Sequence, residues 1–272
     1  MSLREAPLLY VFMETNRIPQ QRAFFERLLG LPLIEIEPHL PHHRHGVTKY
    51  DAGEIIFSLN LSGPNRFRED ESDALETVFS VAPAWQARSL TAPGSGLSTL
   101  DDRLFTDREG HHFAFLPDAA ENGHSGAHPV VTELRLTVDD LEASIRFYRD
   151  LLDLELVERS DGGACFATGS VPLRLVRGAA AADGRRPRRH AYLVVFHTDD
   201  IERMRAALVD RGLELKTPRA GYSEIGGTIR FDDPSGNRFC LYEPSEKCLT
   251  WSSGPKVIEI ANGFGLKRRA IC

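Results

Sequence analysis

The sequence predicts an α+β fold built from tandem βαβββ units, because the chain repeats itself and each copy alternates between strand and helix patterns. The segment RAFFERLLGLPLIEI at 22–36 returns as IRFYRDLLDLELVER at 145–159, an offset of 123 residues. A second pair, FTDREGHHFAFL from Phe105 and FDDPSGNRFCLY from Phe231, returns at an offset of 126 residues. Two separate blocks at nearly one offset indicate a duplicated domain.

The C-terminal copy contains two such units. Residues 133–138 (ELRLTV) alternate polar and apolar side chains, as a half-buried strand does, and the apolar spacing at 141–152 predicts an amphipathic helix. A second helix is expected from Ile201 to Gly212, where the glycine ends it. The other strands of this half are expected at 154–157, 164–167, 172–176, 192–198, 213–216, 227–231 and 238–242.

The N-terminal copy follows the same plan with weaker patterns. Its helices are expected at 19–29 and from Pro83, and its strands at 8–14, 33–37, 54–60 and 76–81. The composition divides the chain into a first domain at 5–118, a polar linker at 119–129, a second domain at 130–245 and a C-terminal extension at 246–272. Within the extension, 256–260 could add an edge strand.

Bulk properties narrow the class of protein. A chain of 272 residues with a net charge of −6 gives no general reason to expect nucleic acid or an anionic membrane as a partner. No apolar stretch approaches the length of a membrane span, and the N-terminus lacks the plan of a signal peptide. The four cysteines show no CxxC spacing, so we expect reduced thiols in a cytoplasmic protein, without a disulfide framework or a zinc site.

Three polar clusters have both a structural and a functional interpretation. The basic run at 184–190 predicts a solvated loop between strands, with an anion-binding site as the alternative. The pair His111 and His112 predicts a hairpin turn with a surface role rather than a catalytic one. A third cluster predicts a solvent-facing loop, with opportunistic metal binding as the alternative; it comprises His39, His42, His43 and His45.

The chain resembles the vicinal oxygen chelate superfamily, which includes glyoxalase I, bleomycin-resistance proteins and extradiol dioxygenases. The resemblance rests on LTVDDLEASIRFYRDLLDLELV at 136–157, VVFHTDDIERMRAALVDRGLEL at 194–215 and the closing hairpin FDDPSGNRFCLYEP at 231–244. It implies two tandem glyoxalase-like domains, each a pair of βαβββ units that form a curved mixed sheet, or cup, around a ligand. Many members hold a divalent metal in the cup.

The resemblance also implies which positions face the cups. In order of the four units, these positions are Tyr10 and Ser58, Glu76 and Ala114, Glu133 and Arg174, and Leu193 and Cys240. Whether units pair within a half or across halves stays open, but neither pairing supplies two histidines and a carboxylate, or another good set of metal ligands. We therefore expect a cup without a metal cofactor.

The favoured hypothesis is a protein that binds a small, largely apolar, oxygen-bearing organic molecule, with ligand contacts from Tyr10, Ser58, Arg174, Leu193 and Cys240. A metal-independent isomerase or lyase is the second hypothesis, with Glu133 and Glu76 as catalytic acid or base. The structural alternative for Glu133 is an ion pair with Arg174 or with another arginine across the sheet, and for Cys240 a buried small side chain. The third hypothesis is a metal-dependent dioxygenase or glyoxalase with displaced ligands. A homodimer is possible.

Overall fold

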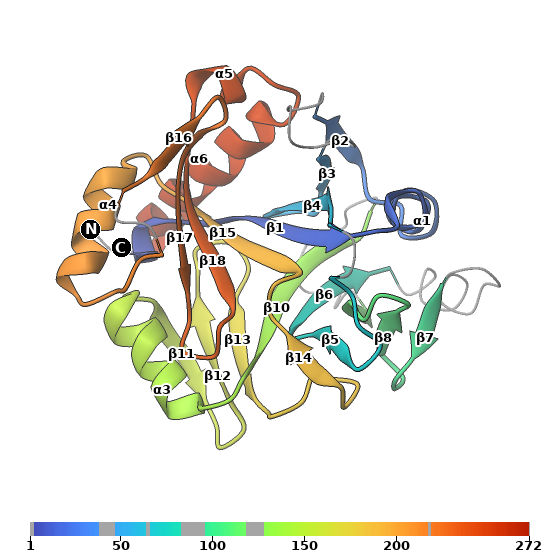
Figure 1. Cartoon of the computed structure of the whole chain (residues 1–272). Coiled ribbons are helices and arrows are strands. Elements are labelled where there is room, and N and C mark those ends of the chain that lie inside the picture. Colours follow the sequence, from blue (N-terminus) through green and yellow to red (C-terminus); the bar gives the residue numbers. More distant parts are fainter. Residues whose placement is uncertain are drawn as a thin grey trace.

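The computed structural model describes residues 3–37, 47–63, 66–82, 96–117, 128–216 and 219–271. Two mixed eight-stranded sheets and one two-stranded sheet form its framework, and helices cover the large sheets (Figure 1). This arrangement confirms the α+β fold with tandem βαβββ units. No helix among these residues is both long and apolar enough to cross a membrane.

The first large sheet, here called the β1 sheet, has the strand order β16-β17-β18-β15-β1-β4-β3-β2. Its strands from the N-terminal half are β1 (Leu8–Thr15), β2 (Leu33–Ile36), β3 (Thr48–Asp51) and β4 (Ile56–Leu61). Its strands from the C-terminal half are β15 (Tyr192–His197), β16 (Gly221–Ser223), β17 (Gly226–Asp232) and β18 (Arg238–Pro244).

The second large sheet, here called the β10 sheet, has the order β11-β12-β13-β10-β6-β9-β8-β7. The N-terminal half supplies β6 (Leu75–Val81), β7 (Leu97–Thr99), β8 (Leu104–Asp107) and β9 (His112–Pro117). The C-terminal half supplies β10 (Val130–Val138), β11 (Glu155–Arg159), β12 (Gly163–Ala167) and β13 (Leu173–Arg177). The small sheet pairs β5 (Glu71–Asp73) with β14 (Arg186–Arg188).

Each large sheet therefore combines one unit from each half of the chain. The joints are antiparallel strand pairs, with Tyr10 of β1 opposite Val195 of β15 and Arg135 of β10 opposite Glu76 of β6. Of the two pairings that the sequence leaves open, the structure has the one across halves.

The helices pack against the sheets through repeated aromatic contacts. Helix α1 (Ile18–Arg22) continues into the π-helical turn η2 (Ala23–Leu28), and α3 (Leu141–Arg146) into η3 (Phe147–Leu151). Asp140 caps α3, and Asp200 caps α4 (Ile201–Asp210), each by accepting from a backbone N–H of the first turn. The ring of Phe25 meets Phe113 edge-on, just as its counterpart Tyr148 meets Phe239.

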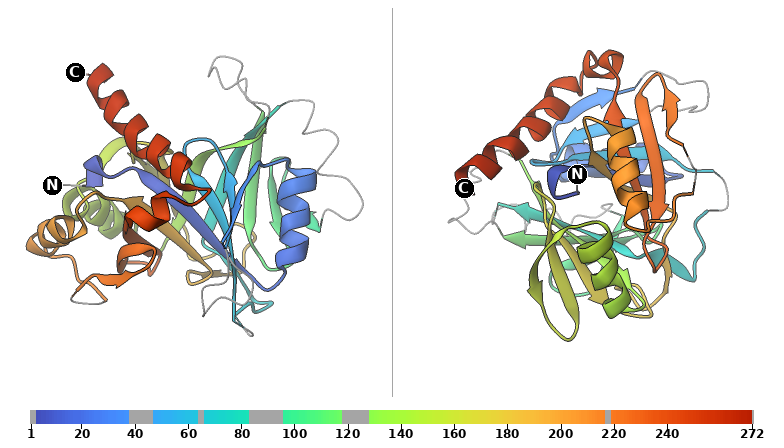
Figure 2. Two further views of the ribbon diagram at one scale, coloured as in Figure 1. Left: turned by 90° about the horizontal axis from the view of Figure 1, so that it is seen from above. Right: turned by 90° about the vertical axis from the view of Figure 1, so that its left-hand side faces the viewer.

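The C-terminal extension is helical, so the expected edge strand at 256–260 is wrong. It forms α5 (Glu246–Leu249) and α6 (Gly254–Ile271), and α6 lies beside the strands of the β1 sheet (Figure 2). Pro255 suits the first turn of a helix, and Val257 and Ile260 are buried three residues apart while Ile258 is exposed. The burial therefore follows a helical period rather than a strand period.

A strand at 213–216 is also wrong. Leu213 donates its N–H to Leu208 O and so closes α4. Within 213–216, only the backbone N–H of Lys216 bonds to β17, at Arg230 O. The edge strand of that unit is β16 instead. The helix expected from Pro83, most of the linker at 119–129 and the histidines at 39–45 lie outside the described residues.

Candidate functional site

The β1 sheet carries a cavity of about 160 Å³ on the face that bears Tyr10. Tyr10, Val195 and Cys240 lie side by side in register across β1, β15 and β18. The remaining walls include Phe12, Leu193, Ile225 and Tyr242, so the lining is mainly apolar.

Three residues predicted as ligand contacts thus line one cavity: Tyr10, Leu193 and Cys240. Ser58 lies next to them, paired in register with Phe12 of β1 and Lys49 of β3, both of which line the cavity. Arg174 does not belong to this group, because it lies on the β10 sheet.

A buried charge cluster forms one wall of the cavity. The Lys49 ammonium lies 2.5 Å from Glu37 Oε1 and 3.1 Å from Glu35 Oε2, and it donates to Ser253 Oγ at 3.0 Å. It also lies 5.7 Å from the centre of the Trp251 ring. The segment between α5 and α6 therefore helps to position the lysine. Lys49 is not among the residues predicted from the sequence, because no strand is expected at 48–51.

Two buried oxygens beside the lysine have no hydrogen-bond partner among the described residues: Ser58 Oγ and Asn60 Oδ1. Both residues lie on β4, and Asn60 lines the cavity. A buried polar group without a partner is costly, on the order of 1–3 kcal/mol each. Asn60 Oδ1, in the lining, therefore suits a ligand that brings its own hydrogen-bond donor, and Ser58 Oγ is a second unpaired oxygen two residues away on the same strand.

The thiol of Cys240 and the hydroxyl of Tyr10 in the cavity wall keep their protons. Burial raises the pKa of Cys240 to about 12 and raises the pKa of the Tyr10 hydroxyl well above its usual value. A thiol with a raised pKa is a poor nucleophile, so Cys240 is a buried small side chain, as its structural alternative held.

The β10 sheet carries a different surface, a row of alternating charges. Glu133 accepts a short hydrogen bond from Arg135 Nε and a second, of 3.1 Å, from Arg174 Nε. Arg135 also donates to Glu76 at 2.7 Å, and Arg174 to Glu158 at 3.1 Å. The ion pair of Glu133 with Arg174, its structural alternative, is therefore present, together with a pair to Arg135 that the sequence analysis did not foresee.

Glu76 lies at the buried end of this row. Burial raises the pKa of Glu76, although Arg135 opposes the shift. His112 lies opposite Glu76 in the β6–β9 register. A carboxyl group with a raised pKa can act as a general acid or base. Glu133 and Glu76, the two residues proposed for acid–base chemistry, lie on the same sheet.

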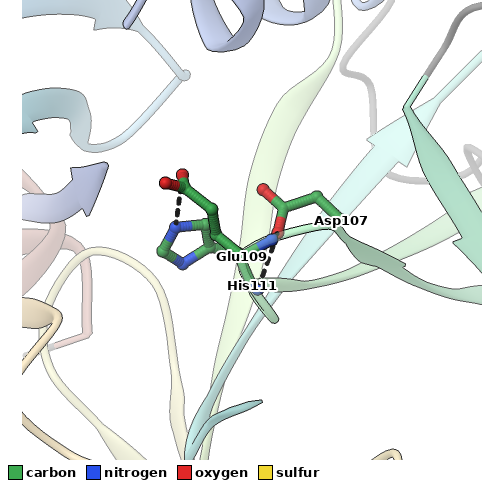
Figure 3. Close-up of side chains that lie close together, drawn as sticks. All are labelled: Asp107, Glu109 and His111. Atoms are coloured by element: carbon green, nitrogen blue, oxygen red, sulfur yellow. Dashed lines mark hydrogen bonds and ion pairs between the residues drawn. The ribbon is translucent and has the colours of Figure 1, made fainter. Parts of the chain in front are cut away.

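Asp107, Glu109 and His111 make a third cluster, at the hairpin between β8 and β9 (Figure 3). Their candidate ligand atoms all lie within 4.8 Å of one another. His111 Nδ1 lies 2.6 Å from Asp73 Oδ2, and Nε2 lies 3.7 Å from Glu109 Oε2. Burial alone would lower the pKa of His111, but Asp107 and Asp73 outweigh it and raise the pKa to about 10. The imidazole is therefore a cation between two carboxylates.

Comparison with the second copy indicates that this cluster has a structural role. Glu109 Oε1 accepts from the N–H of Asn16, at the end of β1, at 2.9 Å. In the second copy, Ser235 Oγ accepts from the N–H of Asp139, at the end of β10, at 3.0 Å. Both hairpins fasten the first strand of the neighbouring unit in the same way, and the first copy does so with charged side chains.

Two predictions about polar clusters are only partly right: residues 111–112 do lie in a hairpin, and Arg186 and His190 of the basic run are exposed, but the junction between them is buried. His111 and His112 are almost fully buried instead of lying at the surface. Arg188 of the basic run lies in β14 rather than in a solvated loop, and its guanidinium binds Asp73. The hairpin packs against β5 and β14 instead of facing water, which no local pattern in the sequence indicates.

Comparisons with known proteins agree with this architecture. Residues 127–241 match the model of the Glyoxalase/Bleomycin resistance protein/Dioxygenase superfamily. The cadmium-induced protein CadI from Mycobacterium tuberculosis is 31% identical over 139 residues, which cover 48% of this chain and 87% of CadI. The chain belongs to the glyoxalase/bleomycin resistance/dioxygenase superfamily.

Solved structures of this superfamily share the whole tandem fold. Glyoxalase I from Zea mays superposes with a TM-score of 0.65 at 16% identity, over 88% of this chain and 92% of the maize chain. A candidate dioxygenase from Bacillus subtilis gives 0.63 at 13% identity, over 94% and 96% of the two chains. At this identity the likeness concerns the fold alone.

The donor atoms of the two superfamily cups fit a divalent metal poorly. In the β1 sheet, Leu193 offers no ligand atom and the Lys49 cation lies in the cavity wall. In the β10 sheet, Ala114 offers none, and arginines already bind both carboxylates of the expected set. Carboxylates that are bridged by guanidinium groups would have to be released before they could coordinate a cation.

Proposed function

We propose that this superfamily member binds a small, largely apolar organic molecule with a hydroxyl or carboxyl group in the cavity of the β1 sheet. The observation that carries the proposal is a buried oxygen without a described partner in the cavity lining, Asn60 Oδ1, among mainly apolar walls; a second such oxygen, Ser58 Oγ, lies two residues away on β4. Apolar walls with a few placed polar groups are the usual composition of a site for an organic ligand.

The volume limits the size of the ligand. A cavity of about 160 Å³ is close to the roughly 150 Å³ that accommodates benzene in an apolar protein core. The ligand class is therefore a single ring or a short branched chain with one polar group. Lys49 can approach a carboxylate or a hydroxyl oxygen of such a ligand from the wall of the cavity.

Ligand-observed NMR with the full chain tests this proposal. The probes are benzoic acid, phenol and cyclohexanol, each at several concentrations. The variant Cys240→Met fills the cavity, and Cys165→Met is the matched control, because Cys165 is also buried but lies on the β10 sheet. We expect saturable binding in the wild type and in Cys165→Met, and loss of binding in Cys240→Met. Binding that survives in Cys240→Met would place the ligand elsewhere.

We also propose that binding needs no metal, on the strength of the donor sets of the two cups. Elemental analysis by mass spectrometry, before and after incubation of tag-free protein with iron, manganese, zinc and nickel salts, tests this part. Near-stoichiometric retention of one metal would contradict it and would favour dioxygenase or glyoxalase chemistry.

The second candidate is a metal-independent isomerase or lyase on the β10 sheet, and the raised pKa of Glu76 is the observation that favours it. Glu133 and Glu76 would then act as the acid and base, with Arg135 and Arg174 holding the Glu133 carboxylate in place. In an enzyme of this kind, Glu133→Gln would lose turnover and keep substrate binding. Loss of both would indicate that the row is structural.

A further inference from the structure

A second hollow lies where the two halves meet, next to the small sheet of β5 and β14. It encloses about 770 Å³ and is lined by the segment before β5, by the residues that follow β14 and by the hairpin that opens β18. Neither half supplies this groove alone. Its residues belong neither to the cavity of the β1 sheet nor to the charged row of the β10 sheet.

The lining of the groove is basic, although the chain as a whole is acidic. Arginine and lysine contribute six side chains to its lining, against two carboxylates, whereas the whole chain has a net charge of −6. The basic side chains are Arg66, Arg68, Arg188, Arg189, Lys216 and Arg238. Such a concentration of one sign in a hollow raises the local concentration of the opposite charge.

Arg188 is a buried residue of the groove lining. Its side chain has no exposed surface, and its Nε and Nη2 atoms donate to Asp73 Oδ1 and to Glu109 O, each at 2.8 Å. Its guanidinium carbon lies 4.5 Å from the centre of the Phe67 ring, which fixes the plane of the group. The remaining nitrogen, Nη1, is buried and has no hydrogen-bond partner among the described residues.

A second donor without a partner lies next to it. Arg189 Nε is buried and unpaired among the described residues, while its Nη2 binds Asp139 at 2.8 Å. Arg189 lines the groove beside Arg188. Two guanidinium groups that line the groove are thus each bound by a carboxylate and each keep a buried N–H without a described partner.

The rim is also basic. Arg66 and Arg238 converge on His190, and each donates to the carbonyl oxygen of His190, at 3.4 Å and 2.8 Å. Both also approach Glu14, which is their shared acidic partner. Arg68 is exposed and makes no ion pair with a described residue. The rim therefore presents more positive charge than its carboxylates neutralise.

We propose that this groove binds the oxyanion group of a small molecule, a phosphate ester or a polycarboxylate. Guanidinium groups suit both, because their N–H pairs match the spacing of phosphate and carboxylate oxygens. The two acidic residues of the lining, Glu71 and Asp232, limit the basic surface and favour a compact anion over a long polyanion.

Isothermal titration calorimetry with the full chain tests the proposal, with sodium pyrophosphate and citrate as separate probes. The variant Arg66→Gln/Arg68→Gln removes two rim cations whose side chains are exposed, so it should fold. Arg146→Gln/Arg203→Gln is the matched control, with two exposed arginines on α3 and α4. We expect saturable binding of at least one probe, at least tenfold weaker in the groove variant, unchanged in the control and weaker at high salt.

The result that overturns the proposal is absence of saturable binding of either probe, or equal weakening in both double variants, which would indicate nonspecific charge attraction. Preference between the probes separates a phosphate site from a carboxylate site. Tighter binding of a single-stranded oligonucleotide than of pyrophosphate would also overturn it, in favour of a nucleic acid surface. Cys240→Met should leave anion binding unchanged, so this test is independent of the proposed function.

Discussion

Lys49 lies with its ammonium nitrogen 2.5 Å from Glu37 Oε1, and less than a tenth of either side chain is exposed. Glu35 Oε2 lies 3.1 Å from the same nitrogen, so one buried cation pairs with two buried carboxylates. The cluster joins β2, β3 and the segment after β2, and Ser253 connects it to the C-terminal extension. One lysine thus connects the strands at this edge of the β1 sheet with the C-terminal extension.

Replacing Lys49 with Met should destabilise the chain by roughly 3–5 kcal/mol, because two buried carboxylates lose their counter-charge. The triple variant Lys49→Met/Glu35→Gln/Glu37→Gln should recover much of this loss, since no buried charge is left unpaired. Urea denaturation, followed by circular dichroism, measures both. Equal stability of the single variant and the wild type would show that water reaches the carboxylates.

His111 should make stability depend on pH above neutrality. Its pKa rises from about 6.5 in an unfolded chain to about 10 in the fold, so the folded state binds the proton more tightly. The stabilisation is fully present below pH 6.5 and is lost as the pH rises towards 10. It should amount to a few kcal/mol, on the order of 1.4 kcal/mol for each unit of pKa difference.

The matched variant for this effect is His111→Asn, because the second copy has Asn237 at the equivalent position. Its melting temperature should fall less steeply than that of the wild type between pH 6.5 and 10. Parallel curves for the two proteins would mean that His111 is neutral in the fold and that another group causes the dependence.

Glu133→Gln should cost roughly 1–2 kcal/mol, because the carboxylate accepts from two arginines and is mostly shielded from water. Glu142→Gln is the control, since the pair of Glu142 with Arg159 is half exposed and should contribute under about 0.5 kcal/mol. Chemical denaturation at low and high salt measures both. A ligand of the β1 sheet should bind Glu133→Gln as it binds the wild type, because the two sheets carry separate surfaces.

The duplication made most of the fold predictable from the sequence. Strand alternation and the repeated aromatic helix located the units, and the same packing recurs in both copies, with ring centres 5.8 Å apart in Phe25–Phe113 and in Tyr148–Phe239. The pairing of units across halves was not predictable, because each unit has a strand edge that fits either partner.

The candidate site was predictable only where the superfamily places it. Tyr10, Leu193 and Cys240 follow from aligned positions on strands, which fix the face of each side chain. Lys49 and Arg188 do not, because their burial depends on carboxylates brought from elsewhere in the chain. A buried cation and an exposed cation have the same local sequence pattern, so only the tertiary structure separates them.

The two hairpin aspartates lead to the last prediction. Asp233 Oδ2 accepts from the Tyr148 hydroxyl at 2.9 Å, whereas Asp107 Oδ2 accepts from Gln21 Nε2 at 2.5 Å. The first copy has Phe25 in place of the tyrosine, so a glutamine one turn earlier in the helix supplies the missing donor. In the second copy Asn237 Nδ2 also donates to Asp233 Oδ2, at 2.8 Å, so that oxygen has two donors.

Tyr148→Phe should cost about 1–2 kcal/mol, because it removes one of the two donors to a buried carboxylate oxygen, and it should raise the already elevated pKa of Asp233 further. Gln21→Leu should cost a similar amount in the first copy. Adding Phe25→Tyr to Gln21→Leu should restore part of that stability, because the ring at 25 has the same orientation as the ring at 148. Thermal and urea unfolding of the four proteins decide this. If Phe25→Tyr lowers stability further in the Gln21→Leu background, the two copies are not interchangeable at this contact, and the glutamine has a role that a phenol cannot fill.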